Sequence, residues 1–366
     1  MLIWIDPSIT QINWGNNADA CSGIEAVFRA FYLGDHFVLS DRSTLTTLKN
    51  RVEFSNVTRL TINKIINDLP ILGDLKNQVS IKVNVVNNPD IDYIKLTENT
   101  WNISLQHLGR TGISKSILLA ENLDDASLYI HAGRQYKIAN KINAEQSIER
   151  AHGGGSTTPE CLQNLTSNEK KFCFCITDSD RECPDDTMGA MAARCKKIAS
   201  ETQAVAKHMD LQVREIENLI PLSFIKEAIP PTHIELWENH EKLIACRNDL
   251  HSYVDLKEGL QLSRLLSLPN GSPRKQYWMS ILDSLTNKAL FSSPCDSKNS
   301  CIQPICNCIV ANGFGPALSK TVLDLLDKQN SHKSLEISKN DSNHEAWESI
   351  GRDVFEWGIS PKRMRL

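Results

Sequence analysis

The chain has 366 residues, of which 41% are hydrophobic and 23% charged, and its formal net charge at pH 7 is −4. This length allows a substantial buried core and suggests two or three domains. The small negative charge excludes a globally basic nucleic-acid-binding protein. Any contact with nucleic acid must therefore come from a local patch, or from metal ions that screen the phosphates.

No segment of the sequence resembles a membrane or secretion signal. The first residues lack a basic stretch followed by an apolar core and a cleavage site. The longest apolar runs, 117–120 and 172–176, are far shorter than the roughly 20 residues that cross a bilayer. Eleven cysteines are typical of buried thiols or metal ligands in a reducing compartment. We expect a soluble, cytoplasmic protein with no membrane partner.

Residues 1–110 mix short β-like runs with helical patterns. The β-like runs are 36–39 and 79–86, and the helical patterns are 23–32 and 58–72. This alternation predicts an N-terminal α/β domain, to which the sequence assigns no role.

From Ser116 onwards, apolar strands alternate with helical patterns, which is typical of βαβ units. We expect a mostly parallel sheet flanked by helices, in a second domain over 111–225. The predicted strands are 116–121, 147–151, 171–177 and 211–214, and the predicted helices are 124–141, a helix from about 157, and 186–209.

The remainder, 226–366, is predicted to be a mainly helical C-terminal domain with a polar loop at 331–345. It contains four cysteines within 14 residues, a number that suits a closed structural Zn²⁺ site. Their spacing lacks the paired C-x₂-C knuckles of familiar zinc motifs, so free thiols remain the alternative. The four are Cys295, Cys301, Cys306 and Cys308.

Acidic residues follow two of the predicted strands. In an open α/β sheet, ligands bind beyond the carboxyl ends of the strands. Glu121 follows the first strand, and Asp125 would lie in the first turn of the next helix. Asp178 and Asp180 follow the third strand, two residues apart, so extended geometry would point both carboxylates to one side. Such oxygen ligands predict a Mg²⁺ or Mn²⁺ site.

Carboxylates gathered in this way repel one another unless cations are bound. Bound Mg²⁺ can neutralise a scissile phosphate, orient a water molecule and stabilise the leaving oxygen. The turn Gly153-Gly154-Gly155 is expected to let backbone N–H groups approach a phosphate. Lys257 could reach a phosphate from the loop 253–259, but the favoured interpretation of this loop is an ordinary turn before the next helix.

Three motifs in this order resemble the TOPRIM fold: Leu118–Asp125 (LLAENLDD), His152–Gly155 (HGGG) and Ile176–Asp180 (ITDSD). The resemblance is closest to the nuclease branch, which includes the overcoming-lysogenization-defect (OLD) nucleases and related effectors of bacterial anti-phage systems. Arg214–Asn218 (REIEN) also resembles the Arg-x-Ile-Glu-Asn stretch that often follows their fourth strand, and adds Glu217.

The resemblance implies a Mg²⁺-dependent nuclease that acts on DNA or RNA as a defence effector. Asn122 departs from the pattern because it replaces the usual glycine after the glutamate. No G-x-x-x-x-G-K-[ST] loop is present, so we expect a separate ATPase or regulatory subunit as partner. The implied catalytic residues are Glu121, Asp178 and Asp180, and the implied metal ligands are Glu121, Asp125, Asp178, Asp180 and Glu217.

Two other interpretations remain open. The first is a non-catalytic TOPRIM-like module that binds a nucleotide or a nucleic acid as a scaffold or sensor. The second is a phosphatase or phosphotransferase of the haloacid dehalogenase class, which also has an Asp-x-Asp at a strand end. In that class the first aspartate follows the first strand of the domain, whereas Asp178 follows the third predicted strand, which counts against it.

Overall fold

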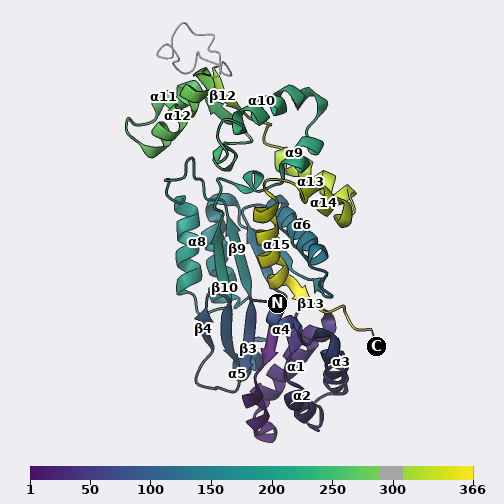
Figure 1. Ribbon diagram of the computed structural model, residues 1–366. Helices are drawn as coiled ribbons and strands as arrows, with labels where there is room; N and C mark the ends of the chain where they lie inside the picture. Colours follow the sequence, from purple (N-terminus) through teal and green to yellow (C-terminus); the bar gives the residue numbers. More distant parts are fainter. Residues whose placement is uncertain (288–307, 366) are drawn as a thin grey trace. The chain divides into compact units, whose positions relative to one another are not determined.

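The computed structural model describes residues 1–287 and 308–365, which form a mixed α/β protein (Figure 1). It divides into two compact units. The first comprises 1–176, 194–209 and 348–366, and the second 177–193 and 210–347. Among the described residues, no helix combines the length and the hydrophobicity that a membrane-spanning segment needs.

The first unit contains a five-stranded sheet in the order β2-β1-β3-β5-β4. Neighbouring strands run parallel, except that β4 is antiparallel to β5. The interior strand β1 is apolar throughout and mostly buried, as expected for a strand covered on both faces. The strands are β1 Leu2–Ile5, β2 Phe37–Leu39, β3 Lys82–Val86, β4 Tyr93–Thr97 and β5 Thr100–Ser104.

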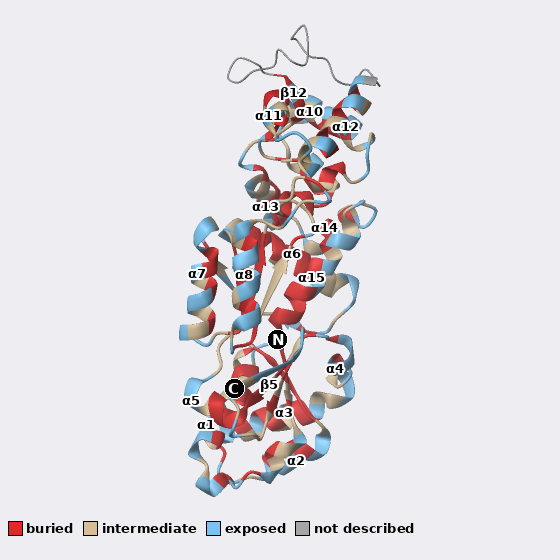
Figure 2. Ribbon diagram, turned by 90° about the vertical axis from the view of Figure 1, so that its left-hand side faces the viewer, coloured by how far each residue is buried: buried red, intermediate tan, exposed pale blue. Residues whose placement is uncertain are grey.

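Helices pack around this sheet, with α1, α2 and α3 grouped together (Figure 2). The first three begin at Asn17, Asp41 and Ser55, whose side chains accept a hydrogen bond from the backbone N–H three residues later. The close approach of α1 and α5 requires Gly23, because a Cβ atom there would lie 2.2 Å from the Leu105 carbonyl oxygen. The helices are α1 Ala18–Leu33, α2 Arg42–Lys49, α3 Asn56–Leu72, α4 Leu75–Gln78 and α5 Leu105–Thr111.

A second sheet has the strand order β10-β9-β6-β8. β6 runs parallel to both β8 and β9, with Leu119 opposite Ala151 on one side and Cys175 on the other. The carboxyl ends of β6 and β9 therefore lie at the same edge of this sheet. The elements are β6 Ile117–Ala120, α6 Leu123–Ala139, β8 Glu149–His152, α7 Thr158–Gln163, β9 Cys173–Thr177, α8 Ala190–Glu201 and β10 Ala206–Asp210.

The prediction for the last part of this sheet is wrong. We expected a helix over 186–209 and a strand over 211–214, but α8 ends at Glu201 and the strand is β10. The physical reason is burial. Val205 and Ala206 are almost fully buried, and the Val205 carbonyl accepts a hydrogen bond from the Cys173 N–H at 3.0 Å. Pairing with β9 therefore stabilises an extended conformation where the local pattern favours helix.

The C-terminal segment belongs to the first unit from Glu348 onwards. It consists of the end of α15 (His344–Gly358) and of β13 (Ile359–Ser360), which pairs antiparallel with β7 (Glu145–Gln146). Trp357 is fully buried and stacks on Phe174, with ring centroids 5.4 Å apart. One Glu356 carboxylate oxygen accepts the N–H groups of Ser80 and Ile81. Residues more than 200 positions apart thus share one core.

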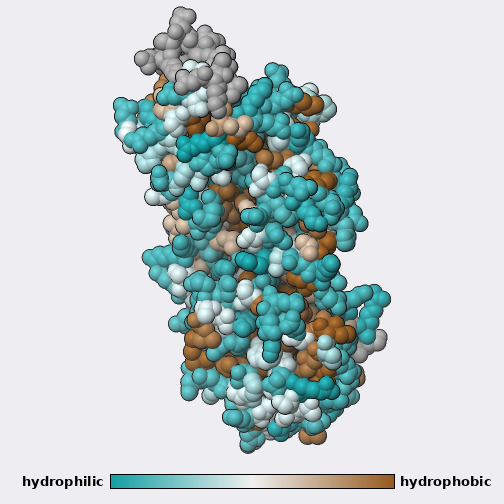
Figure 3. Space-filling view, in the orientation of Figure 1, coloured by the Kyte–Doolittle hydropathy of each residue, from teal (hydrophilic) through white to brown (hydrophobic). Residues whose placement is uncertain are grey.

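The described part of the second unit is mainly helical and contains a two-stranded antiparallel ribbon. The polar loop expected at 331–345 is wrong, because 331–338 form α14 and α15 begins at His344. The surface seen in Figure 3 is mostly hydrophilic, with hydrophobic residues in separate patches. The elements are α9 Leu222–Ala228, α10 Ile234–Ile244, β11 Gly259–Gln261, α11 Leu262–Ser267, α12 Pro273–Asn287, β12 Ile309–Asn312, α13 Leu318–Lys328 and α14 Ser331–Ser338.

Candidate functional site

The loop that follows β9 is fastened to residues 213–216 within the second unit. The N–H groups of Ser179 and Asp180 both donate to the Arg214 carbonyl at 3.0 Å. The Ile216 N–H donates to the Asp178 Oδ1 atom at 3.1 Å. These bonds hold the Asp178 carboxylate beside the REIEN stretch, although 38 residues separate Asp178 from Ile216.

Asp180 has a left-handed backbone, with φ at 56°. Aspartate tolerates this conformation better than most residues. The Asp180 side chain is exposed and lies over Gly189, where an added Cβ atom would be 2.5 Å from Oδ2. The carboxylate thus lies close to the Gly189 backbone.

Glu217 is completely buried, which is unusual for a carboxylate. It lies in a short 3₁₀ turn (Ile216–Asn218), and the Asn218 side chain fixes this turn by donating to the carbonyls of His251 and Val254. The hydroxyl of Ser319 donates to Glu217 Oε1. The turn therefore directs an acidic side chain inward.

Lys257 joins the two glutamates of this turn. Its Nζ atom lies 2.9 Å from Glu215 Oε2 and 3.2 Å from Glu217 Oε1. The other oxygen of each carboxylate, Glu215 Oε1 and Glu217 Oε2, is buried and has no hydrogen-bond partner among the described residues. A buried carboxylate oxygen without a partner is costly, so this arrangement favours a bound cation or proton.

The electrostatics of this group are strongly coupled. Burial, followed by repulsion from Glu217, raises the pKa of Glu215 from 4.5 to about 7. Burial lowers the pKa of the Lys257 ammonium, but the carboxylates of Glu217 and Glu215 raise it, and the net shift of this pKa is upward. Asp178 also contributes to the rise, which places its charge within electrostatic reach of Lys257.

The raised pKa of Glu215 predicts a pH dependence of stability. Between about pH 4.5 and about pH 7 the folded chain binds this proton and the unfolded chain does not, so the free energy of unfolding falls as pH rises through this window. Urea unfolding at several pH values should show this slope, and Glu215→Gln should reduce it. An unchanged slope in Glu215→Gln would contradict the assignment.

Sequence reasoning found only part of this group. It identified Asp178, Glu217 and Lys257, but it missed Glu215, which the alternation of acids in REIEN could have indicated. The short distance along the sequence would also allow Glu217 to pair with Arg214. The structure pairs Arg214 instead with Asp255 at 2.9 Å and Glu182 at 3.3 Å.

Glu121 and Asp125 lie in the first unit. Glu121 directly follows β6, and Asn122 begins α6 by accepting the Asp125 N–H at 2.9 Å. The Asn122 side-chain amide also donates to the Asp125 carboxylate at 2.6 Å. Asn122, the departure from the TOPRIM pattern, therefore caps the helix and orients a predicted metal ligand.

The glycine turn does not form the phosphate-binding cradle that we expected. The Gly153 N–H donates to the Ala120 carbonyl at 2.8 Å, and those of Gly154 and Gly155 donate to the Glu121 carbonyl at 3.1 and 3.4 Å. All three N–H groups are thus used within the protein. The turn instead holds the backbone at the end of β6.

The predicted cysteine cluster falls mainly outside the described residues. This applies to Cys295, Cys301 and Cys306, while Cys308 is described and buried.

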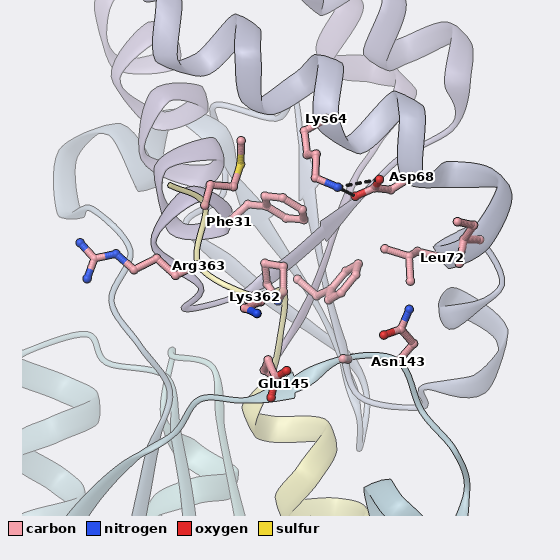
Figure 4. Close-up of a pocket in the computed structure, with 13 residues that line it drawn as sticks. Phe31, Lys64, Asp68, Leu72, Asn143, Glu145, Lys362 and Arg363 are labelled. Atoms are coloured by element: carbon pink, nitrogen blue, oxygen red, sulfur yellow. Dashed lines mark hydrogen bonds and ion pairs between the residues drawn. The ribbon is translucent and has the colours of Figure 1, made fainter. Parts of the chain in front are cut away.

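A cavity of about 570 Å³ in the first unit, drawn in Figure 4, contains the Lys64–Asp68 ion pair. None of the predicted site residues lines this cavity.

Comparisons with known proteins add no assignment. No protein-family model, curated protein or solved structure matches this chain. The TOPRIM resemblance therefore rests on the motifs, and any function must be argued from the residues themselves.

Proposed function

We propose that the protein is a Mg²⁺- or Mn²⁺-dependent nuclease that hydrolyses phosphodiester bonds of DNA or RNA. The observation that carries this proposal is the fully buried Glu217 carboxylate, which shares Lys257 with Glu215 and keeps one oxygen without a hydrogen-bond partner among the described residues. Three carboxylates, including Asp178, act on this one ammonium. The excess negative charge favours a cation.

The chemical type of the donors suits a hard divalent ion. Asp178 and Glu217 offer carboxylate oxygens, and Asp180 stands two residues after Asp178. Such oxygen-only sets suit Mg²⁺ or Mn²⁺ rather than soft metals. When bound, the ion would neutralise the scissile phosphate and lower the pKa of a coordinated water molecule.

The protein's own groups supply the remaining roles. Lys257 is the cation that can contact a phosphate oxygen. Glu215, which lies 2.9 Å from Lys257 Nζ, would take the proton of the attacking water when the water oxygen bonds to phosphorus. The ester P–O bond then breaks, and the leaving oxygen takes up a proton. Glu121 and Asp125 are proposed as metal-binding residues of the first unit on the TOPRIM resemblance alone.

A second candidate is a scaffold or sensor that binds a nucleotide or nucleic acid without turnover. The observation that counts against turnover is that Lys257 is already paired with two carboxylates and the glycine-turn N–H groups are donated internally, so neither acts on a scissile phosphate as the chain stands. Binding without cleavage in the presence of both metals would favour this candidate.

The test is a cleavage assay with end-labelled single-stranded DNA, duplex DNA and total RNA, each with EDTA, Mg²⁺ or Mn²⁺. We expect at least one substrate to be cut with a divalent metal and none to be cut with EDTA. Cleavage that is equal with EDTA would overturn the metal-dependent mechanism. Intact substrates under all conditions, combined with measurable binding, would support the scaffold.

The biological setting is proposed on the resemblance alone. The protein would act as an effector in bacterial anti-phage defence, controlled by a separate ATPase or regulatory subunit. Protection of cells against phage, lost together with cleavage in an Asp178→Asn variant, would support this role. Protection that persists without cleavage would contradict it.

A further inference from the structure

A second group of metal-binding side chains lies in the interior of the first unit. Cys175, Cys195 and His208 each offer a ligand atom, and these atoms all lie within 4.8 Å of one another. Both thiols are completely buried, and the imidazole is half-buried. None of the three belongs to the acidic group around Glu217.

The fold explains why these residues meet. Cys175 is in β9 and His208 is in β10, the neighbouring strand of the four-stranded sheet. Cys195 is in α8, and its thiol is hydrogen-bonded to that of Cys175. β10 is the next element after α8, so Cys195 and His208 come from consecutive elements of the chain. Cys175 comes from β9, the strand with which β10 pairs.

We propose that Cys175, Cys195 and His208 bind a soft divalent metal, with Zn²⁺ as the natural occupant. In a tetrahedral zinc site with Zn–S bonds of about 2.3 Å, ligand atoms lie about 3.8 Å apart. The ligand atoms all lie within 4.8 Å of one another, so they need to approach by at most about 1 Å to reach this value. Two thiolates would balance the charge of the ion, which favours binding in a buried position.

Cys173 lies near this group without belonging to it. Side chains two residues apart on a strand point to the same face, so Cys173 shares the face of Cys175. Among the described residues, the ligand atoms that all lie within 4.8 Å of one another are those of Cys175, Cys195 and His208. A water molecule would therefore fill the fourth position of a tetrahedral ion.

The protonation of the thiols couples metal binding to pH. The hydrogen bond with Cys195, together with burial, raises the pKa of Cys175 well above its usual range. A metal binds the thiolate form of cysteine, so binding displaces the protons of the thiols. We expect metal affinity to increase as pH rises.

The experiment uses the full chain carrying Cys301→Ser, which disables the separate cysteine cluster at 295–308. The protein is purified under reducing, metal-free conditions and titrated with Co²⁺ and then Zn²⁺. We expect a thiolate-to-cobalt charge-transfer band and the visible bands of tetrahedral Co²⁺, both lost when Zn²⁺ is added at about one equivalent per chain. X-ray absorption at the zinc edge should show a mixed sulfur and nitrogen shell.

Variants locate the site. Cys195→Ser should abolish the cobalt bands, whereas Cys21→Ser and Cys246→Ser, at half-buried thiols outside the cluster, should retain them. A titration of the Cys301→Ser chain that gives no tetrahedral thiolate spectrum overturns the proposal, whatever the variants do. A zinc shell of sulfur alone, or of oxygen and nitrogen alone, does so too.

Discussion

Asp178→Asn should lower the rate of metal-dependent cleavage by about 10³-fold at saturating Mg²⁺, because losing a metal-binding charge costs several kcal/mol of transition-state stabilisation. Asparagine has the same size, and its oxygen can still accept the Ile216 N–H that Asp178 accepts. The loop after β9 should therefore remain fastened. Single-turnover cleavage of the best substrate measures the rate, and Asp180→Asn is expected to behave in the same way.

Asp341→Asn is the matched control. Asp341 also accepts backbone N–H groups in the second unit, from Ser223 at 2.8 Å and Asn343 at 2.9 Å. Asp341→Asn also removes a carboxylate charge that accepts backbone N–H groups, but Asp341 is not one of the proposed metal ligands. The rate of cleavage should therefore be unchanged. If Asp178→Asn and Asp341→Asn cleave at equal rates, Asp178 does not act in the reaction.

The sequence predicted the strands that carry these acids because burial leaves a local signature. β6 and β9 are apolar along their length, and the polar residues begin where each strand ends. The sequence therefore indicated that Glu121, Asp178 and Asp180 follow the ends of strands. Their hydrogen-bond partners were not, because those partners come from distant positions.

The partners of the REIEN stretch show this limit. Arg214 and Glu217 are close enough along the sequence to pair with each other. Tertiary packing instead pairs Arg214 with Asp255 and Glu217 with Lys257. Forty residues separate Glu217 from Lys257 along the chain. No local pattern could choose between these pairings, since each depends on where the 3₁₀ turn directs its side chains.

The prediction of a polar loop at 331–345 was wrong for a related reason. In α14 the buried residues are Ser334, Leu335 and Ser338, so one apolar side chain stands among polar ones and the segment resembles a loop. Its N-terminus is fixed by Asn330, whose side chain accepts the His332 N–H. Helices with so few apolar residues depend on packing that only the folded chain supplies.

Lys257→Met should destabilise the folded protein by about 2–4 kcal/mol, because it leaves the Glu217 carboxylate buried without its cation. Methionine keeps most of the apolar stem, so lost packing contributes little. Lys257 is 28% exposed, which places the expected cost below that of a fully buried pair. The free energy of unfolding in urea, measured without divalent metal, gives the value.

Two comparisons make this result specific. Lys226→Met breaks an exposed pair with Glu241 and should change the free energy of unfolding by less than about 1 kcal/mol. Lys257→Met combined with Glu217→Gln removes both charges and should recover most of the lost stability. A loss no larger than that of Lys226→Met would show that Glu217 is not held by Lys257. The double variant should nevertheless fail to cleave, because regained stability does not restore the carboxylate and ammonium groups that act on the phosphate.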